Sequence, residues 1–171
     1  NRPDEMYSLT GQSTIAKTSA EVIEVHLDPP DPPASPSVLE AIETSDVLVL
    51  GPGSWFTSVM PHLLVPQIVE AIMDSDALKI LTLNVAGADE TNGFSPARHL
   101  EVLAEHEPRI RFDVVLADRS FARSDPHLGT FARNLGARIV EADLAMHDGS
   151  ARHDPLRLAS AYAEVMGVHI R

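Results

Sequence analysis

Residues 51–58 carry the residue types that hold a phosphate group. This stretch directly follows the apolar run Val47–Leu50 and combines glycine with hydroxyl side chains. Glycine lets the backbone approach a ligand closely, and the N–H groups at the start of a helix attract an anion. A tight turn whose hydroxyls only cap a helix would explain the same composition. The stretch has no lysine, so it is not a P-loop, and it matches neither GxGxxG nor a nucleophile elbow. The candidate residues are Gly51, Gly53, Ser54, Thr57 and Ser58.

A second polar stretch, residues 84–94, leads from an apolar run to a predicted helix start at Ser95. Connections of this kind usually have about two to six residues, and longer loops at the end of a sheet are often functional. Asn84 could hydrogen-bond a base or a sugar, and Glu90 could bind a ribose hydroxyl or act as a base. A solvated polar loop is the alternative.

Charged and imidazole side chains gather a third time before the last predicted helix. Arg152 and His153 stand directly before Asp154-Pro155, so a cation and an imidazole lie beside the N–H groups of a helix start. Such a place suits a phosphate or a carboxylate. The alternative is that Asp154 only caps the helix and that its neighbours are exposed. The whole cluster is Asp143, His147, Asp148, Arg152, His153 and Asp154.

No metal site is expected from the histidines of this sequence. It contains neither HExxH nor two histidines spaced by three residues on one helix. His99 and His106 are too far apart along their helix to share one ion. His99, near the N-terminus of its helix, could face the ligand pocket. His106 is expected to be exposed near the helix C-terminus, where an imidazole interacts favourably with the helix dipole.

A repeated pattern of apolar runs and amphipathic segments positions these polar stretches. Short runs rich in Val, Ile and Leu are typical of strands buried in a parallel sheet, and the amphipathic segments between them are typical of helices. Helices are predicted to begin where Ser or Asp precedes Pro, because the first residue caps the helix and Pro needs no N–H partner there. The predicted strands are residues 47–50, 79–83, 112–116 and 138–140. The predicted helix starts are Ser35-Pro36, Ser95-Pro96, Asp125-Pro126 and Asp154-Pro155.

This alternation predicts an α/β fold with a doubly wound, mostly parallel sheet. An antiparallel hairpin of residues 13–18 and 21–28 is predicted to be added to it, because Ile23, Val25 and Leu27 alternate with polar residues. The prolines of residues 29–33 predict a stiff connector. Ligands of such sheets bind at the carboxyl ends of the strands. We therefore expect the three polar stretches to meet at that edge.

The composition excludes several classes of protein. The chain has 171 residues, 13 Lys and Arg against 25 Asp and Glu, a net charge of −12 and no Cys. The acidic balance argues against a nucleic-acid partner, because neutralising phosphates supplies most of that affinity. The lack of Cys excludes disulfides, thiolate zinc sites and Cys nucleophiles. No apolar run approaches the ~20 residues of a membrane span, and the first residues are no signal peptide, so no membrane insertion is expected.

Together these stretches resemble the YvcK/CofD-like family, and in particular its YvcK-like branch, whose members are called gluconeogenesis factors. The resemblance covers nearly the whole chain. Its longest matching stretch is residues 45–66, of which residues 51–66 are the most specific block. The other matching stretches are residues 11–15, the Pro-rich connector, Glu90-Thr91-x-Gly93-Phe94 leading to His99, and Arg152-His153-Asp154.

The resemblance implies a cytoplasmic protein with a Rossmann-like three-layer αβα domain. It implies binding of a nucleotide sugar such as UDP-N-acetylglucosamine or UDP-glucose, and a link to cell shape and envelope precursor metabolism. No settled catalytic activity belongs to that branch. Homo-oligomers and envelope-synthesis proteins are the protein partners that it leaves open. The alternative, from the CofD-like branch, is a 2-phospholactate transferase of deazaflavin coenzyme biosynthesis, and only this alternative brings in Mg²⁺.

The resemblance also bears on the domain and on the ligand residues. Family members begin with a strand and a Gly-rich turn of the GGGTG type, and nothing in this chain matches it. We therefore expect the C-terminal portion of a larger domain, with a single α/β domain of residues 1–171 as the alternative. Residues 1–34 would be the hairpin and connector, and residues 35–171 the βα repeats. The implied ligand-binding residues are Gly51, Gly53, Ser54, Thr57, Ser58, Asn84, Glu90, Thr91 and Arg152.

Overall fold

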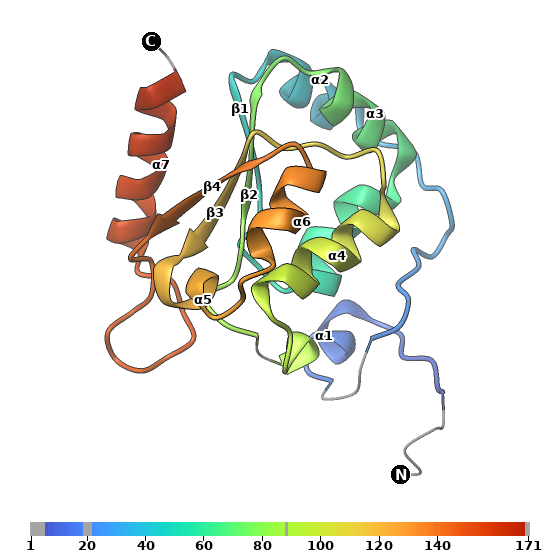
Figure 1. Cartoon of the computed structure of the whole chain (residues 1–171). Coiled ribbons are helices and arrows are strands. Elements are labelled where there is room, and N and C mark those ends of the chain that lie inside the picture. Colours follow the sequence, from blue (N-terminus) through green and yellow to red (C-terminus); the bar gives the residue numbers. More distant parts are fainter. Residues whose placement is uncertain (1–5, 19–21, 88, 170–171) are drawn as a thin grey trace.

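The sheet of this protein has four parallel strands in the order β1-β2-β3-β4 (Figure 1). The structure is a computed structural model that describes residues 6–18, 22–87 and 89–169. Pairing aligns Val49 with Ile80 and Ile80 with Val114, and it continues in parallel to β4. The prediction of a parallel sheet is confirmed. The strands are β1 Val47–Leu50, β2 Leu78–Thr82, β3 Val114–Asp118 and β4 Arg138–Ala142.

Helices cover both faces of this sheet, which gives the expected three layers. Connections between parallel neighbours are almost always right-handed, so helices that join strands in sequential order fall on one face. Accordingly α3, α4 and α6 lie on one face, with α2 beside α3, and α7 lies on the other (Figure 1). The helices are α1 Gln12–Ile15, α2 Pro36–Thr44, α3 Pro66–Asp74, α4 Pro96–His106, α5 Arg119–Arg123, α6 Leu128–Asn134 and α7 Pro155–His169. Three further short helices are the π-helix η1 Trp55–Val59 and the 3₁₀ helices η2 Met60–Leu64 and η3 Asp89–Thr91.

Alternate residues of the central strands enter two separate cores. In β3, Val115 and Ala117 pack with the side chains of α3, α4 and α6. Val114 and Leu116 pack against α7 instead. All residues of β3 are buried, as expected for a strand covered on both faces. Packing on both faces holds β3 in place between the two layers of helices.

Three of the four predicted helix starts are confirmed. α2, α4 and α7 begin at the prolines that follow Ser35, Ser95 and Asp154. The hydroxyl of Ser95 accepts the N–H of Arg98 at 3.2 Å, as a helix cap does. The fourth start is wrong. The carboxylate of Asp125 accepts the N–H of His127 in a turn, and α6 begins only at Leu128.

The predicted N-terminal hairpin is not formed by the described residues. Residues 13–15 belong to α1, whose first N–H groups bond to the carbonyl of Gly11. Residues 22–27 have no strand partner, and residue 21 lies outside the described residues. The alternating apolar residues do not share one buried face. Ile23 is 73% exposed, whereas Val25 is buried in the core of α3 and α4. The Pro-rich segment of residues 29–33 forms neither helix nor strand, as predicted.

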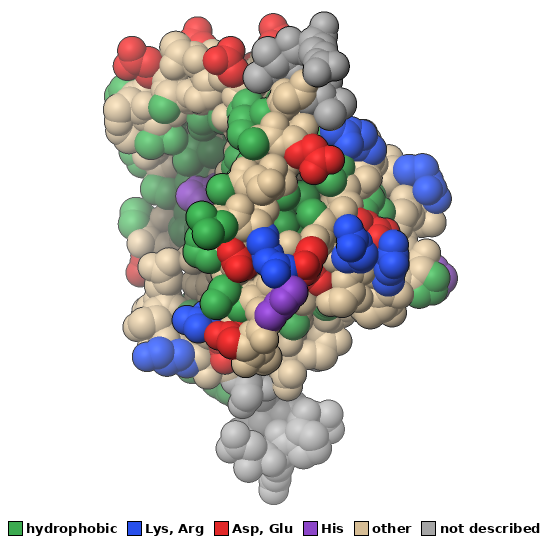
Figure 2. All heavy atoms as spheres, turned by 90° about the vertical axis from the view of Figure 1, so that its left-hand side faces the viewer, with side chains coloured by type: hydrophobic (Ala, Val, Ile, Leu, Met, Phe, Trp, Pro, Cys, Tyr) green, Lys and Arg blue, Asp and Glu red, His purple; other side chains and the backbone are tan. Residues whose placement is uncertain are grey.

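The face of the sheet that α7 covers is not closed over β1. Figure 2 looks onto this side, where hydrophobic side chains continue beyond the charged ones into a hollow at the upper left. Val49, which points to this face from the edge strand β1, is 47% exposed. Among the described residues, no single helix is long and apolar enough to cross a membrane. Residues 55–64 and α3 meet that test only as a pair bent by 79°.

Candidate functional site

The three predicted polar stretches meet at the carboxyl ends of the strands, at the lower end of the sheet in Figure 1. The first stretch follows β1 and enters η1. The second follows β2, contains η3 and ends at α4. The third, which we call the β4–α7 loop, comprises residues 143–154.

The loop after β1 needs glycine where it leaves the sheet. Gly51 has a φ of +77°, and a Cβ there would lie 2.6 Å from the carbonyl oxygen of Thr82. Any larger residue would push β1 and β2 apart, because this backbone approach leaves no room. The loop therefore crosses the end of β2 in close contact.

Asn84 fastens the first loop to the second. Its Oδ1 accepts the N–H of Gly53 at 3.2 Å, and its Nδ2 donates to the carbonyl of Gly53 at 3.0 Å. One side chain thus satisfies both backbone groups of one residue. The structure thus brings together Asn84 and Gly53, two of the residues predicted for the site.

Glu90 occupies a place that the sequence predicts for a ligand. Its Oε1 accepts the N–H of Phe56 at 2.8 Å, in the first turn of η1. The residue is 4% exposed, and Oε2 is buried with no hydrogen-bond partner among the described residues. The carboxyl group of Glu90 therefore takes one of the N–H groups that were expected to bind phosphate.

The hydroxyl residues of the first two loops divide into buried and accessible ones. Thr57 and Thr91 are 6% and 2% exposed. Ser58 is exposed, Ser54 is half-buried, and neither hydroxyl makes a hydrogen bond within the described part of the chain. Gln12 of α1, which the sequence analysis did not assign to the site, donates to the carbonyl of Thr57 at 2.6 Å. Ser54 and Ser58 are thus the hydroxyls left for a ligand.

His99 lies behind the loops and does not face the ligand pocket, as the sequence had left open. It is fully buried, with its ring edge-on to Trp55 at 4.9 Å and to Phe94 at 5.4 Å between centroids. Its Nδ1 lies 2.8 Å from the carbonyl of Ser95, so Nδ1 carries a proton. Burial lowers the pKa of His99, and the Ser95 carbonyl opposes this only in part. A neutral ring in an aromatic cluster supports the loops and is closed to a ligand.

The β4–α7 loop presents Arg152 to solvent. The side chain of Arg152 is 72% exposed and lies 3.4 Å from a carboxylate oxygen of Asp148 and 3.3 Å from the hydroxyl of Ser150. Asp143 and His147 pair instead with Arg157 of α7. Arg152 is therefore the exposed cation of this cluster, paired only within its own loop among the described residues.

His153 joins the third loop to the second. Its imidazole lies beside the carbonyl of Leu83, the last residue before Asn84. Its Nε2 is buried and has no hydrogen-bond partner in the described residues. Burial lowers the pKa of His153, while the Leu83 carbonyl and the charge of Asp118 oppose that shift. The predicted cluster therefore divides, with His153 turned inward and Arg152 outward.

Asp118 lies at the same edge of the sheet and was not among the residues predicted from the sequence. It ends β3, two residues beyond the predicted end of that strand, and it is 3% exposed. Burial alone would raise the pKa of Asp118, but hydrogen bonds from Ser120, Leu144 and Phe121 outweigh it and leave that pKa below its ordinary value. A polar residue directly after an apolar run could have identified Asp118, because the same pattern identified Asn84.

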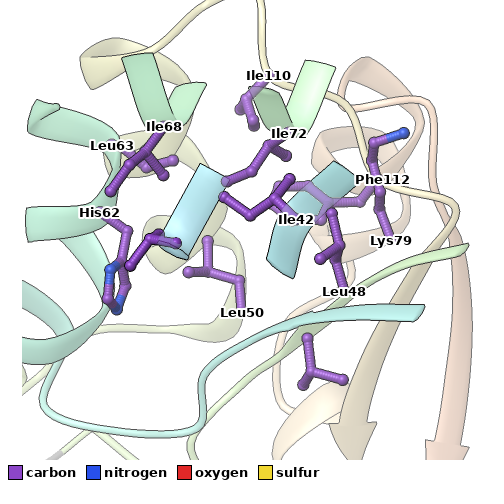
Figure 3. A pocket seen from close by; sticks show the side chains of 12 residues that line it. Ile42, Leu48, Leu50, His62, Leu63, Ile68, Ile72, Lys79, Ile110 and Phe112 are labelled. Carbon is purple, nitrogen blue, oxygen red and sulfur yellow. The ribbon is translucent and has the colours of Figure 1, made fainter. Parts of the chain in front are cut away.

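A separate hollow lies between β1, α2 and α3 (Figure 3). It is a cavity of about 210 Å³, into which aliphatic side chains point from all three elements. Its polar members are His62 and Lys79, and the ammonium of Lys79 donates to the carbonyl of Ser75. Such an apolar lining offers few donors to a phosphate, so the loops remain the candidate site. No group of three or more metal-ligating side chains occurs among the described residues.

This chain is similar in sequence and in structure to known proteins, over most of its length. The "Putative gluconeogenesis factor" of Mycobacterium leprae is 43% identical over 157 residues, which are 90% of this chain and 44% of that protein. The protein of the same name from a Nostoc species is 34% identical over 176 residues, 93% of this chain and 39% of that protein. A crystal structure of a Bacillus halodurans protein has a TM-score of 0.74 and 30% identity over 91% of this chain and 55% of that chain.

This chain therefore spans less than half the length of the two curated relatives. The family model described as "2-phospho-L-lactate transferase CofD" matches residues 3–154. That match includes every strand of the sheet and all the loops described above. The chain belongs to the CofD family, and the curated relatives named here carry the name of gluconeogenesis factors.

Proposed function

We propose that this protein binds a nucleotide sugar and acts as a gluconeogenesis factor linked to cell shape and envelope precursor metabolism in the cytoplasm. UDP-N-acetylglucosamine and UDP-glucose are the ligands to test first. The observation that carries the proposal is the lock between the first two loops, in which Asn84 bonds to both backbone groups of Gly53. This lock joins the block in which the resemblance to the family is most specific to the start of the loop that carries Glu90 and Thr91.

A diphosphate suits the groups that the lock leaves accessible. Phosphate oxygens accept hydrogen bonds, and the hydroxyls of Ser54 and Ser58 are donors without partners in the described structure. Arg152 can turn from Asp148 toward an anion, because an ion pair between exposed side chains contributes little. The net charge of −12 does not oppose this binding, since distant charges are screened over ~8 Å at physiological salt.

Calorimetry tests the proposal on this chain and, in parallel, on the longer Mycobacterium leprae relative. We expect both to release or take up heat when titrated with UDP-N-acetylglucosamine up to millimolar concentration. Replacing both Ser54 and Ser58 by Ala removes two donors and should weaken binding about ten-fold. Ser160→Ala, on the exposed side of α7, is the matched control. No heat from either protein at millimolar ligand would overturn the proposal.

A 2-phospholactate transferase of deazaflavin coenzyme biosynthesis is the second candidate. The match of the CofD family model over residues 3–154 favours it. The phosphate would be held at the same loop, with the substrate near Glu90 and Mg²⁺ supplied from solution. The test is to incubate the protein with guanylylated phospholactate, the deazaflavin acceptor and Mg²⁺. Coenzyme formation would support a transferase, and absence of product would exclude it.

A further inference from the structure

Asp118 joins two loops of the site through both of its carboxylate oxygens. Oδ1 accepts the N–H of Ser120 at 2.9 Å, its hydroxyl at 2.6 Å, and the N–H of Phe121 at 3.4 Å. Oδ2 accepts the N–H groups of Leu144 and Ala145 at 2.9 and 3.1 Å. A buried side chain that only accepts hydrogen bonds is thus surrounded by donors from α5 and from the β4–α7 loop.

The residues that Asp118 holds are paired in turn with the second arm of the loop, on which Arg152 lies. The β4–α7 loop folds back on itself, with Ala145 and His153 in an antiparallel bridge. The N–H of Met146 donates to the carbonyl of Arg152 at 2.8 Å. On the other side of the bridge, the N–H of Asp154 donates to the carbonyl of Leu144 at 2.7 Å.

On the second arm of the same loop, the imidazole of His153 lies beside the carbonyl of Leu83, just beyond the end of β2. The base of the loop is therefore fixed on both sides. Its tip remains exposed, and Arg152 reaches from the fixed part toward solvent. A flexible cation on a rigid base loses less freedom when it binds an anion than one on a mobile loop.

We infer that Asp118 is a positioning residue of the nucleotide-sugar site, which fixes the β4–α7 loop so that Arg152 can reach a bound phosphate. This inference rests on the proposed function. Asp118 itself does not touch the ligand. A carboxylate is required because both of its oxygens accept hydrogen bonds. The NH₂ group of an amide would face the N–H groups of one of the two loops, and these buried donors would have no acceptor.

Amide hydrogen exchange tests the anchor without any ligand. In the wild-type protein, the amides of Leu144 and Ala145 should exchange as slowly as the amides of β4, although they lie in a loop. In Asp118→Asn they should exchange at least about ten-fold faster, while Leu116 of β3 keeps its rate. If Leu144 and Ala145 in the wild type exchange as fast as the exposed Gly149, the anchor does not exist. That first measurement needs no variant to fold.

A double-mutant cycle on binding tests whether Asp118 acts through Arg152. We expect Asp118→Asn to weaken UDP-N-acetylglucosamine binding about ten-fold in the wild-type background and less than about two-fold in the Arg152→Ala background. Asp76→Asn, which makes the same charge change at an exposed residue before β2, is the matched control. The same factor in both backgrounds would overturn the inference, because a general loss of stability adds independently of Arg152. If the wild type binds no ligand, the proposed function fails, and the exchange experiment still decides whether the anchor exists.

Discussion

Glu90 shows how the protein itself can use a residue that is expected to contact a ligand. Sequence position correctly places Glu90 at the edge of the sheet, but a carboxylate beside helix N–H groups binds them as readily as a phosphate does. The outcome depends on the path of the loop, which residue types alone do not reveal. Asn84 follows the same rule, because its amide has both a donor and an acceptor and finds both in Gly53.

Replacing Asn84 by Ala should therefore weaken the site without exposing a core. The change leaves the N–H and carbonyl of Gly53 without their partner, and we expect the free energy of unfolding to fall by about 1–3 kcal/mol. Binding of UDP-N-acetylglucosamine should weaken about ten-fold or more, because the two loops are no longer locked. Urea denaturation and calorimetry measure the two effects. Asn92→Ala, at an exposed residue of the same loop, is the control, and equal effects of both variants would contradict this account.

The buried His99 should make the stability depend on pH. Because burial lowers its pKa in the folded state, the unfolded chain binds more protons, and stability is lost as the pH falls below about 6.5, the unfolded value. His99→Asn keeps a donor for the carbonyl of Ser95 but cannot titrate. We expect this variant to lose less stability between about pH 8 and pH 5.

The fluorescence of Trp55 reports the unfolding of this region, because Trp55 is the single tryptophan of the chain and lies against His99. The pKa of His153 is lowered as well, so its contribution remains in His99→Asn and the pH dependence should not vanish. His153→Asn should remove a further part of the pH dependence of stability. Identical pH dependence in the wild type and His99→Asn would show that His99 does not titrate on unfolding.

At the scale of elements, periodicity and turn residues predicted what depends on local chemistry. Apolar runs and Ser-Pro or Asp-Pro pairs identified the strands and most helix starts, because caps and buried strands are chosen by neighbouring residues. The N-terminal hairpin failed for a tertiary reason. The alternation of Ile23, Val25 and Leu27 needs a partner strand, and Val25 packs into the core of α3 and α4 instead. The end of β3 was placed too early for the same reason, since pairing of Asp118 with Ala142 decides it.

The loop of residues 84–94 depends on Gly87 for a close backbone approach. A Cβ at Gly87 would lie 2.6 Å from the carbonyl oxygen of Thr91 and 2.8 Å from that of Phe94. Gly87→Ala should therefore lower the free energy of unfolding by about 1–3 kcal/mol and disturb the segment that carries Glu90. Urea denaturation measures the change.

A Gly→Ala substitution in α6 should instead raise the free energy of unfolding. Gly129 lies inside the helix, and the nearest atom to an added Cβ is the end of the Arg133 side chain at 3.5 Å. Gly129→Ala should raise the free energy of unfolding by about 0.5–1 kcal/mol, because Ala has the better helix propensity. Equal effects at Gly87 and Gly129 would contradict the role of close packing in the loop.

At the scale of the whole molecule, the candidate site is an edge where several strands end, and the fold class alone brings the three polar stretches to that edge. The fold class did not reveal which polar side chains at this edge are accessible to a ligand. Ser54, Ser58 and Arg152 remain accessible, whereas Glu90, His99 and His153 are used inside the protein. Sequence spacing brings residues to the same edge, but burial and hydrogen bonds between distant loops decide which of them turn outward.

The proposed site also makes a prediction about chain length. This chain spans 44% of the Mycobacterium leprae relative, and its sheet has an edge strand whose Val49 is 47% exposed. Binding by few, partly exposed groups is weak, because tight sites bury most of a ligand of this size. We therefore expect this chain alone to bind UDP-N-acetylglucosamine at least about ten-fold more weakly than the longer relative. Calorimetry of both proteins in one buffer measures the ratio. Equal affinity would show instead that the loops after β1, β2 and β4 make up the whole site.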